Sequence, residues 1–338
     1  MDFRKLGAAA ATSQFTPKIV KGRVCQADAD VFAYDCADLD TSEASNWEKL
    51  KKWIEQVRIS SQAEFINLHL TMGLKGGRHE MATVKAYQAG RSDRDPAKQA
   101  RVWALRERMV GYTTHNTRGV AWYHQEADDG MAQYQIASIR EGGVQKSIIF
   151  SADKDLWMVE GLHCNVKTYE VTNVRSFGTA VYKDVGNVKP KLIGEGVCWF
   201  WHQMIMGDKA DDIPGLPMLS GRLAEIYLPL KKPNANRKAL ACGEAKAVAI
   251  LKGVRSHKVA YQRVAEAYAD HYGATWQAML FEQAFLLWMR RVDDELDVLK
   301  YLEKTCGFVF QLTPDVLERL QTFRDQLDDT TRYPSTGF

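Results

Sequence analysis

Acidic side chains recur where predicted secondary-structure elements end, and this spacing suits metal-ion chemistry. Two groups follow β-like runs, another follows a short apolar run, and the last follows an apolar helix. The members are Asp28 and Asp30; Glu126, Asp128 and Asp129; Asp153 and Asp155; and Asp208, Asp211 and Asp212. Each group alone is equally well explained by turns or helix starts, where Asp is common. Their recurrence at four elements favours a shared site.

Carboxylates gathered in one cleft would repel one another and raise one another's pKa. Divalent cations remove that repulsion, and ligation by oxygen alone suits Mg²⁺ or Mn²⁺ rather than Zn²⁺. Two such ions about 3.5–4 Å apart suit in-line displacement at phosphorus, which needs no protein nucleophile. The acids therefore indicate a two-metal hydrolase of phosphodiesters, with Mg²⁺ as the expected cofactor and Mn²⁺ as a substitute.

These acids need a scaffold that brings them together. The main β-like runs are at 18–26, 65–71, 119–123 and 147–150, and helical spacing is found at 127–139 and 196–206. Further strands are predicted at 157–159, 166–174 and 180–185. Alternating strands and helices indicate an α/β fold with a mostly parallel central sheet flanked by helices. In such a sheet the carboxyl ends of the strands share one edge, where ligands bind.

Length and composition bound the organisation of the chain. Its 338 residues predict about two domains. We predict an α/β catalytic domain at 1–215 and a helical region at 216–338. With 46% apolar and 26% charged residues the composition is that of a globular protein, and no apolar run reaches membrane-helix length. The six cysteines form no Cys-x-x-Cys pair, which argues against a disulfide framework or zinc site and favours the cytoplasm.

Charge is distributed unevenly along the chain. Residues 85–118 hold eight Lys or Arg against three acids, and residues 231–263 hold nine against one, although the net charge is only +3. Two basic blocks in a nearly neutral protein indicate two contacts with a polyanion such as DNA. Two solvated helix faces would be the simpler interpretation of either block alone.

Three motifs carry a resemblance to a known family. Residues 126–129 (EADD), 151–155 (SADKD) and 207–215 (GDKADDIPG) resemble, in order and spacing, the signatures of the 5′-nuclease superfamily, which includes flap endonucleases and phage 5′–3′ exonucleases. The resemblance covers about residues 20–255. It implies a PIN-like 5′-nuclease fold with a C-terminal helical DNA-binding region that contains a helix-hairpin-type motif. The small size is most similar to the stand-alone bacteriophage exonucleases.

The resemblance also implies roles for individual residues. The metal ligands would be Asp28, Glu126, Asp128, Asp129, Asp153, Asp155, Asp208 and Asp211, with Asp30 and Asp212 beside them. Residues 87–91 (YQAGR) resemble the start of the family's basic gateway, here about residues 75–118. Arg91, and by position Lys98 and Arg101, would contact the scissile phosphate, and Tyr87 would stack on a base.

The predicted duplex-binding motif departs from the family pattern. Residues 243–251 resemble the second half of the family's helical hairpin, but about 27 residues separate them from Gly215, so that 220–242 is an insertion. Backbone N–H groups near Gly243 would hold a phosphate beside Lys246. Lys252 and Arg255 would bind the duplex from the same basic block.

One expected ligand is missing. The family has an Asp just after the second strand, where this chain has Met72. Asp30 or a residue of the loop at 75–80 would have to replace it.

The resemblance implies a metal-dependent, structure-selective 5′–3′ exodeoxyribonuclease with flap endonuclease activity, serving phage DNA replication or recombination in the host cytoplasm. Its partner would be DNA with a free 5′ end or a 5′ flap, and replication proteins are further candidate partners. Two alternatives stay open: an RNA-directed nuclease that removes primers from RNA/DNA hybrids, and a DNA-binding replication accessory with a weakened site. No contact with a membrane is expected.

Overall fold

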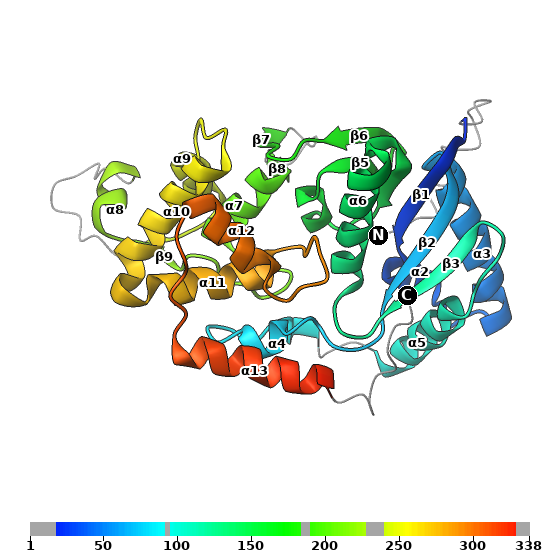
Figure 1. Ribbon diagram of the computed structural model, residues 1–338. Coiled ribbons are helices and arrows are strands. Elements are labelled where there is room, and N and C mark those ends of the chain that lie inside the picture. Colours follow the sequence, from blue (N-terminus) through cyan, green and yellow to red (C-terminus); the bar gives the residue numbers. More distant parts are fainter. Residues whose placement is uncertain (1–17, 92–94, 184–189, 228–239, 329–338) are drawn as a thin grey trace. The chain divides into compact units, whose positions relative to one another are not determined.

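The chain forms two compact units (Figure 1). The computed structural model describes residues 18–91, 95–183, 190–227 and 240–328. Among these residues, the first unit consists of 18–74 and 95–174, and the second of 75–91, 175–183, 190–227 and 240–328. The predicted division into 1–215 and 216–338 stays a prediction.

The first unit is built on a six-stranded sheet with the strand order β3-β2-β1-β4-β5-β6. The strands are β1 (Val20–Asp28), β2 (Ala63–Thr71), β3 (Thr117–Trp122), β4 (Ser147–Phe150), β5 (Gly161–Cys164) and β6 (Val171–Val174). Neighbours from β3 to β5 are parallel, and only β6 is antiparallel to its neighbour. The predicted α/β fold with a mostly parallel sheet is confirmed.

Helices cover both faces of this sheet (Figure 1). They are α2 (Ala29–Cys36), α3 (Glu43–Ser60), α5 (Pro96–Val110) and α6 (Ala127–Gly142), with a short 3-10 helix η3 (Val144–Lys146) after α6. Because side chains alternate along a strand, Ile66 and Leu68 join the apolar core with α2, α3 and α5. Asn67 and His69 lie on the other face, where the His69 ring contacts Tyr134 of α6. Asn67 and His69 are joined on this second face by Gln26, so the face carries a buried polar cluster.

Two of the predicted strands are corrected by the structure. The run at 157–159 lies in and just after a 3-10 helix, η4 (Asp155–Met158), because the Asp153 side chain accepts a hydrogen bond from the N–H of Asp155 and starts a turn. The run at 166–174 is a strand only from Val171, because the Asn165 side chain accepts from the N–H groups of Lys167 and Thr168 and forms a turn. Residues 184–185 lie outside the described residues.

The second unit is mainly helical, as predicted for the C-terminal region. Its elements are α4 (Arg78–Met81), η2 (Ala89–Arg91), β7 (Thr179–Lys183), β8 (Lys191–Glu195), α7 (Val197–Met206), β9 (Met218–Leu219), α8 (Gly221–Tyr227), β10 (Leu240–Ala241), α9 (Glu244–Ile250), α10 (His257–Tyr272), η5 (Gly273–Thr275), α11 (Trp276–Leu287), α12 (Asp297–Cys306) and α13 (Pro314–Asp328). The specific hairpin motif stays a prediction, and most of the predicted insertion, residues 228–239, lies outside the described residues.

Helix α7 is the centre of this unit, and its residues from Val197 to Ile205 are all buried. An aromatic cluster packs against it: the ring of Phe200 lies 5.0 Å from that of Trp288, which in turn stacks on Tyr301 at 4.5 Å. Burial of each such side chain contributes about 1.5–3 kcal/mol. The acidic loop that follows α7 therefore starts from a firmly packed helix. None of the described helices is both long and apolar enough to cross a membrane.

Candidate active site

Three of the predicted acidic groups lie at one edge of the first unit's sheet. β1, β3 and β4 belong to one sheet and run in the same direction, because each is connected to the others through parallel pairs. The acids at the ends of these strands or just after them are Asp28 and Asp30; Glu126, Asp128 and Asp129; and Asp153 and Asp155. We call these seven residues the acidic edge. Their role as metal ligands is a proposal.

Asp28 is the most enclosed acid at the end of β1, with 6% of its surface exposed. One carboxylate oxygen accepts a hydrogen bond from the hydroxyl of Ser151 at 2.9 Å, and the other accepts from the N–H of Val31 at 3.4 Å. Burial, and then the negative charge of Asp30, raise the pKa of Asp28 to about 7, although the Ser151 hydrogen bond opposes the shift. The surroundings of Asp28 therefore disfavour the charged form of its carboxyl group.

The first turn of α6 carries the central acids. Burial, and then the charges of Asp28 and Asp153, raise the pKa of Asp128 well above its usual value, with Glu126 and Asp129 adding to the effect. Gly130 allows this turn to approach β3 closely, since a Cβ there would lie 2.0 Å from the ring of Trp122. The amino end of a helix also favours negative charge.

The loop after β4 is held by its own side chains. The Ser151 hydroxyl that donates to Asp28 accepts a hydrogen bond from the N–H of Asp153 at 3.0 Å. A carboxylate oxygen of Asp153 accepts from the N–H of Asp155 at 2.8 Å, and the Lys154 ammonium lies 3.1 Å from Asp155. Ser151 is a positioning residue that the sequence analysis left without a role, although it is the first residue of the SADKD motif.

The end of β2 shows why Met72 supplies no ligand. Its side chain packs against the apolar core, and its N–H donates to the carbonyl of Trp122 at 2.8 Å. Asp30 reaches this strand end from α2, because a carboxylate oxygen accepts from the N–H of Thr71 at 3.2 Å. The same carboxylate forms an ion pair with Arg106, at 3.0 Å.

In the second unit, the fourth acidic group lies in a tight loop after α7. Asp208 and Ile213 exchange two backbone hydrogen bonds of 2.8 Å, and a carboxylate oxygen of Asp208 accepts from the N–H of Ala210 at 2.9 Å. Gly207 has a φ of 71°, and a Cβ there would lie 2.3 Å from the carbonyl oxygen of Ile213. Glycine is therefore required where the loop begins. Asp208, the next residue, is buried, with 3% of its surface exposed.

The start of the predicted gateway is bound to this same loop. The amide nitrogen of the Gln88 side chain donates to the Asp211 carboxylate at 3.1 Å, and the N–H of Gly90 donates to Asp212 at 3.1 Å. Lys85 forms an ion pair with Asp212. Tyr87 is 5% exposed and its ring contacts His79, so a base cannot stack on it in this conformation.

The predicted phosphate-contacting residues lie in different surroundings. Lys98 lies over the Tyr34 ring, with its ammonium 4.1 Å from the ring centre. Arg101 donates to the carbonyl of Thr41 at 3.0 Å and so holds the loop before α3. The side chain of Arg91 lies outside the described residues. Arg106, which sequence reasoning missed, forms an ion pair with Asp30 of the acidic edge. It lies five residues after Arg101, about 140° around the helix, so spacing alone gives no signal for it.

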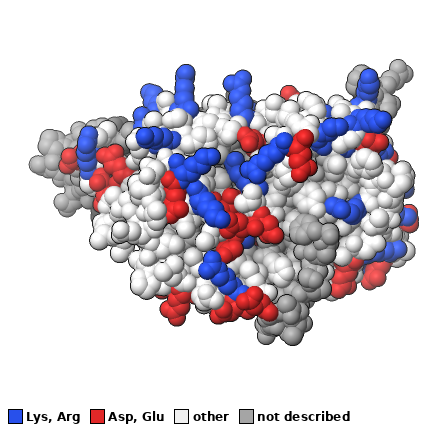
Figure 2. Space-filling model, in the orientation of Figure 1, with Lys and Arg blue, Asp and Glu red and all other residues white. Residues whose placement is uncertain are grey.

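The predicted duplex-binding residues lie around α9. Gly243 is the N-cap of α9, with open space around the position of a Cβ. Lys252 and Arg255 line a groove of about 620 Å³ together with β7 and α7. Figure 2 shows Lys and Arg side chains projecting from this part of the second unit. Lys246 lies in the first turn of α9, and its side chain is partly exposed.

Comparison with solved structures identifies the fold. The chain is similar to bacteriophage T5 5′-exonuclease with bound zinc: 16% of residues are identical, 90% of this chain and 98% of that chain are covered, and the TM-score is 0.52. A complex of bacteriophage T5 flap endonuclease with DNA and metal ions matches at 13% identity over 88% and 99% of the two chains, with a TM-score of 0.43. No family model and no curated protein matches the chain. This chain therefore shares the fold of that 5′-exonuclease structure.

Proposed function

We propose that this protein is a metal-dependent 5′-nuclease that hydrolyses DNA from a free 5′ end and cuts 5′ flaps. One observation carries the proposal: the acidic edge of the first unit gathers seven carboxylates, and their burial and mutual repulsion raise the pKa of Asp28 and Asp128. Such an arrangement is costly without cations, so it indicates a site built to hold them. The solved structure of T5 5′-exonuclease, whose fold this chain shares, contains bound divalent metal ions.

The donor set fits two Mg²⁺ ions, since every candidate ligand is a carboxylate oxygen. In the first unit the ions would be held by Asp28, Glu126, Asp128, Asp129, Asp153 and Asp155, and the family motif adds Asp208 and Asp211 as proposed ligands. When bound, the ions supply charge stabilisation and an activated water for displacement at phosphorus. Mn²⁺ would substitute for Mg²⁺.

Residues of the protein would orient the metal-binding carboxylates and stabilise the charge on the reacting phosphate. Ser151 fixes the relative positions of Asp28 and Asp153 through its two hydrogen bonds. Asp30, held by Arg106 and the N–H of Thr71, is the proposed replacement for the missing carboxylate at Met72. Arg91 would stabilise the charge that develops on the phosphate.

The substrate is proposed from charge. Lys252 and Arg255 are exposed beside the groove at α9, and phosphate contacts by such bases dominate non-specific affinity for duplex DNA. Service in phage replication, in a host cytoplasm and beside replication proteins, belongs to this proposal. RNA/DNA hybrids are the rival substrate, and a binding accessory without cleavage is the rival role.

A time course on duplexes labelled at the 5′ or the 3′ end, with Mg²⁺ or with EDTA, tests the proposal. We expect the 5′ label to be released first as short products, in Mg²⁺ only. The same assay on matched RNA/DNA hybrids, with RNA in the strand that is cleaved, tests the rival substrate. Faster cleavage of the RNA strand than of DNA would make the protein an RNA-directed nuclease. Binding of DNA without any cleavage in Mg²⁺ or Mn²⁺ would support the accessory role and contradict the nuclease.

A further inference from the structure

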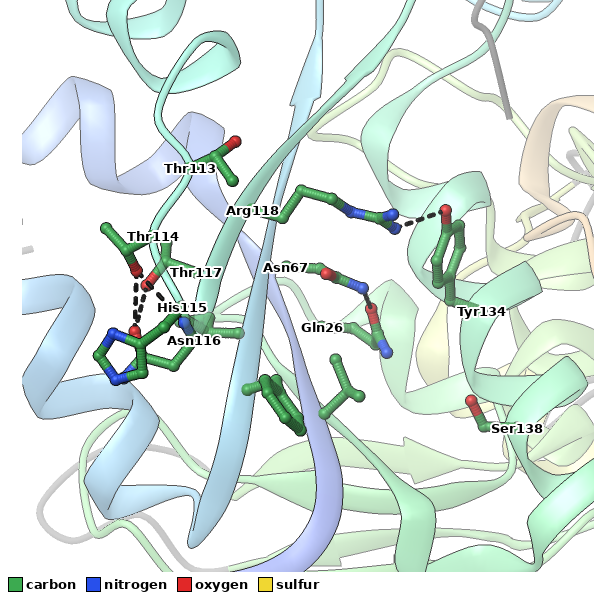
Figure 3. A pocket seen from close by; sticks show the side chains of 13 residues that line it. Gln26, Asn67, Thr113, Thr114, His115, Asn116, Thr117, Arg118, Tyr134 and Ser138 are labelled. Atoms are coloured by element: carbon green, nitrogen blue, oxygen red, sulfur yellow. Dashed lines mark hydrogen bonds between the residues drawn. The ribbon is translucent and has the colours of Figure 1, made fainter.

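A pocket of about 420 Å³ opens on the polar face of the first unit's sheet, away from the acidic edge (Figure 3). It lies over the first halves of β2 and β3 and beside the second half of α6. Phe65 and Asn67 come from β2, Arg118 from β3, and Tyr134 and Ser138 from α6. Its volume is in the range of pockets that hold small ligands.

A chain of hydrogen bonds forms the floor of this pocket. The indole N–H of Trp122 donates to Nδ1 of His69 at 2.9 Å, so Nε2 of His69 carries the proton and donates to Oε1 of Gln26 at 2.9 Å. The side-chain nitrogen of Gln26 donates to the hydroxyl of Ser147 at 3.2 Å. Because indole can only donate, this chain has one direction, and Oε1 of Gln26 must be an acceptor.

The direction of that chain fixes the amide of Asn67. Its nitrogen donates to Oε1 of Gln26 at 3.1 Å, as Figure 3 shows. Its oxygen is then an acceptor on the pocket side, and among the described residues nothing donates to it. Asn67 is only 9% exposed. This oxygen faces the open pocket, where a ligand that carries an N–H or O–H group can replace water as its donor.

The rest of the pocket offers a cation and an aromatic surface. Arg118 donates to the hydroxyl of Tyr134 at 3.1 Å, which holds the guanidinium at the pocket and leaves further N–H groups for an anion. Phe65 keeps 39% of its surface exposed. A planar ring, a hydrogen-bond donor on that ring and an attached anion would complement the three features together.

We propose that this pocket binds a free nucleoside monophosphate. The exocyclic amino group of the base donates to Oδ1 of Asn67, the base packs on Phe65, and the phosphate pairs with Arg118. Adenine and cytosine carry such an amino group. Thymine has none, and its ring donor N3–H lies between two carbonyl oxygens that repel Oδ1, so dAMP should bind more tightly than dTMP. The site does not depend on the nuclease proposal, although a nuclease that releases mononucleotides would meet its own product there.

Isothermal titration calorimetry of the full chain with dAMP, with EDTA present to exclude binding through metal ions, tests this site. We expect saturable binding of one dAMP, at least about tenfold weaker binding of dTMP, and a similar loss for Arg118→Gln and Asn67→Ala. Arg140→Gln is the matched control, because Arg140 is an exposed base of α6 outside the pocket. Phe65→Ser adds a variant at an exposed position, and circular dichroism verifies each fold.

Three results would overturn the site: no saturable heat with dAMP, equal affinity for dAMP and dTMP, or wild-type affinity in both Arg118→Gln and Phe65→Ser. A single-stranded oligonucleotide that binds through Arg118 while dAMP does not would also overturn it, because the pocket would then hold a strand. Since EDTA stops metal-dependent cleavage, failure here leaves the nuclease proposal untouched, and an inactive nuclease leaves this site untouched.

Discussion

Asp212 forms an ion pair with Lys85 and accepts a hydrogen bond from the N–H of Gly90 at 3.1 Å. These contacts, of which the Lys85 hydrogen bond is the stronger influence, lower the pKa of Asp212. The residue that stands where the family motif usually has Asn therefore fastens the start of the gateway to the loop that carries Asp208 and Asp211. This gives Asp212 a structural reason to be acidic that does not involve a metal ion.

Asp212→Asn should change cleavage little. The amide oxygen keeps an acceptor for Gly90, and only the charge toward Lys85 is lost. Because exposed ion pairs contribute little, we expect the rate to fall by no more than about fivefold. Lys85→Met should have a similar effect, and the double variant should be no worse than either single one. Loss of all activity in Asp212→Asn would instead make Asp212 a ligand.

The metal-free protein should lose stability as the pH rises. Asp28 has a pKa of about 7 in the folded chain and about 3.9 when unfolded, so between these values the unfolded chain has released a proton that the folded chain keeps. Below about pH 4 both states are protonated and the penalty is absent, and above about pH 7 it is complete. From pH 5 to pH 8 we expect the free energy of unfolding to fall by about 2–3 kcal/mol.

Urea unfolding in EDTA at several pH values measures this dependence. Asp28→Asn should flatten the slope, and Mg²⁺ should restore the stability of the wild type at pH 8. A wild-type protein that becomes more stable with pH in EDTA would show that the acidic edge is not strained by its own charge.

The basic residues at α9 should determine the salt dependence of duplex binding. Each phosphate contact that is lost removes about 0.9 from the slope of log K against log salt. Replacing Lys246, Lys252 and Arg255 by Gln should therefore lower the slope by up to about 2.7. Replacing the exposed bases Lys52, Arg140 and Lys304 is the control and should leave it unchanged. Equal slopes in both variants would make the block at 231–263 an ordinary solvated surface.

Asp30 should set the metal requirement if it replaces the missing carboxylate at Met72. Asp30→Asn should raise the Mg²⁺ concentration at half-maximal rate, and Mn²⁺ should rescue it better than Mg²⁺ because Mn²⁺ generally binds more tightly. Met72→Asp should lower the requirement, at a cost in stability because Met72 packs against the core. The measurement is cleavage rate against metal concentration. If neither variant moves the midpoint, the ligand comes from another residue, with the loop at 75–80 as the first place to look.

Local patterns predicted the sheet well, and the side-chain contacts only in part. Alternation and strand-end acids located β1, β2, β4 and α6, since these signals lie within a few residues of one another. The prediction of a strand at 157–159 was wrong. The hydrogen bond from the N–H of Asp155 to the Asp153 side chain starts a turn there, and this turn outweighs the apolar pattern.

Long-range partners were not predictable from spacing. Arg106 and Arg101 lie on one helix, yet Arg106 contacts Asp30 whereas Arg101 binds the carbonyl of Thr41. Which base of α5 turns toward the acidic edge depends on how the helix packs on the sheet. Tyr87 shows the same limit, because its burial depends on residues distant in the sequence.

Single-turnover cleavage of a 5′-labelled duplex by wild type, Asp128→Asn and Asp153→Asn, in saturating Mg²⁺, tests metal-dependent catalysis by the acidic edge most directly. Both variants should fold normally and lose about a hundredfold or more in rate, since each removes charge on which transition-state stabilisation depends. Asp40→Asn, at an exposed loop position, is the control and should cleave like the wild type. Mg²⁺-dependent cleavage at wild-type rates in both variants would contradict a metal site at this edge.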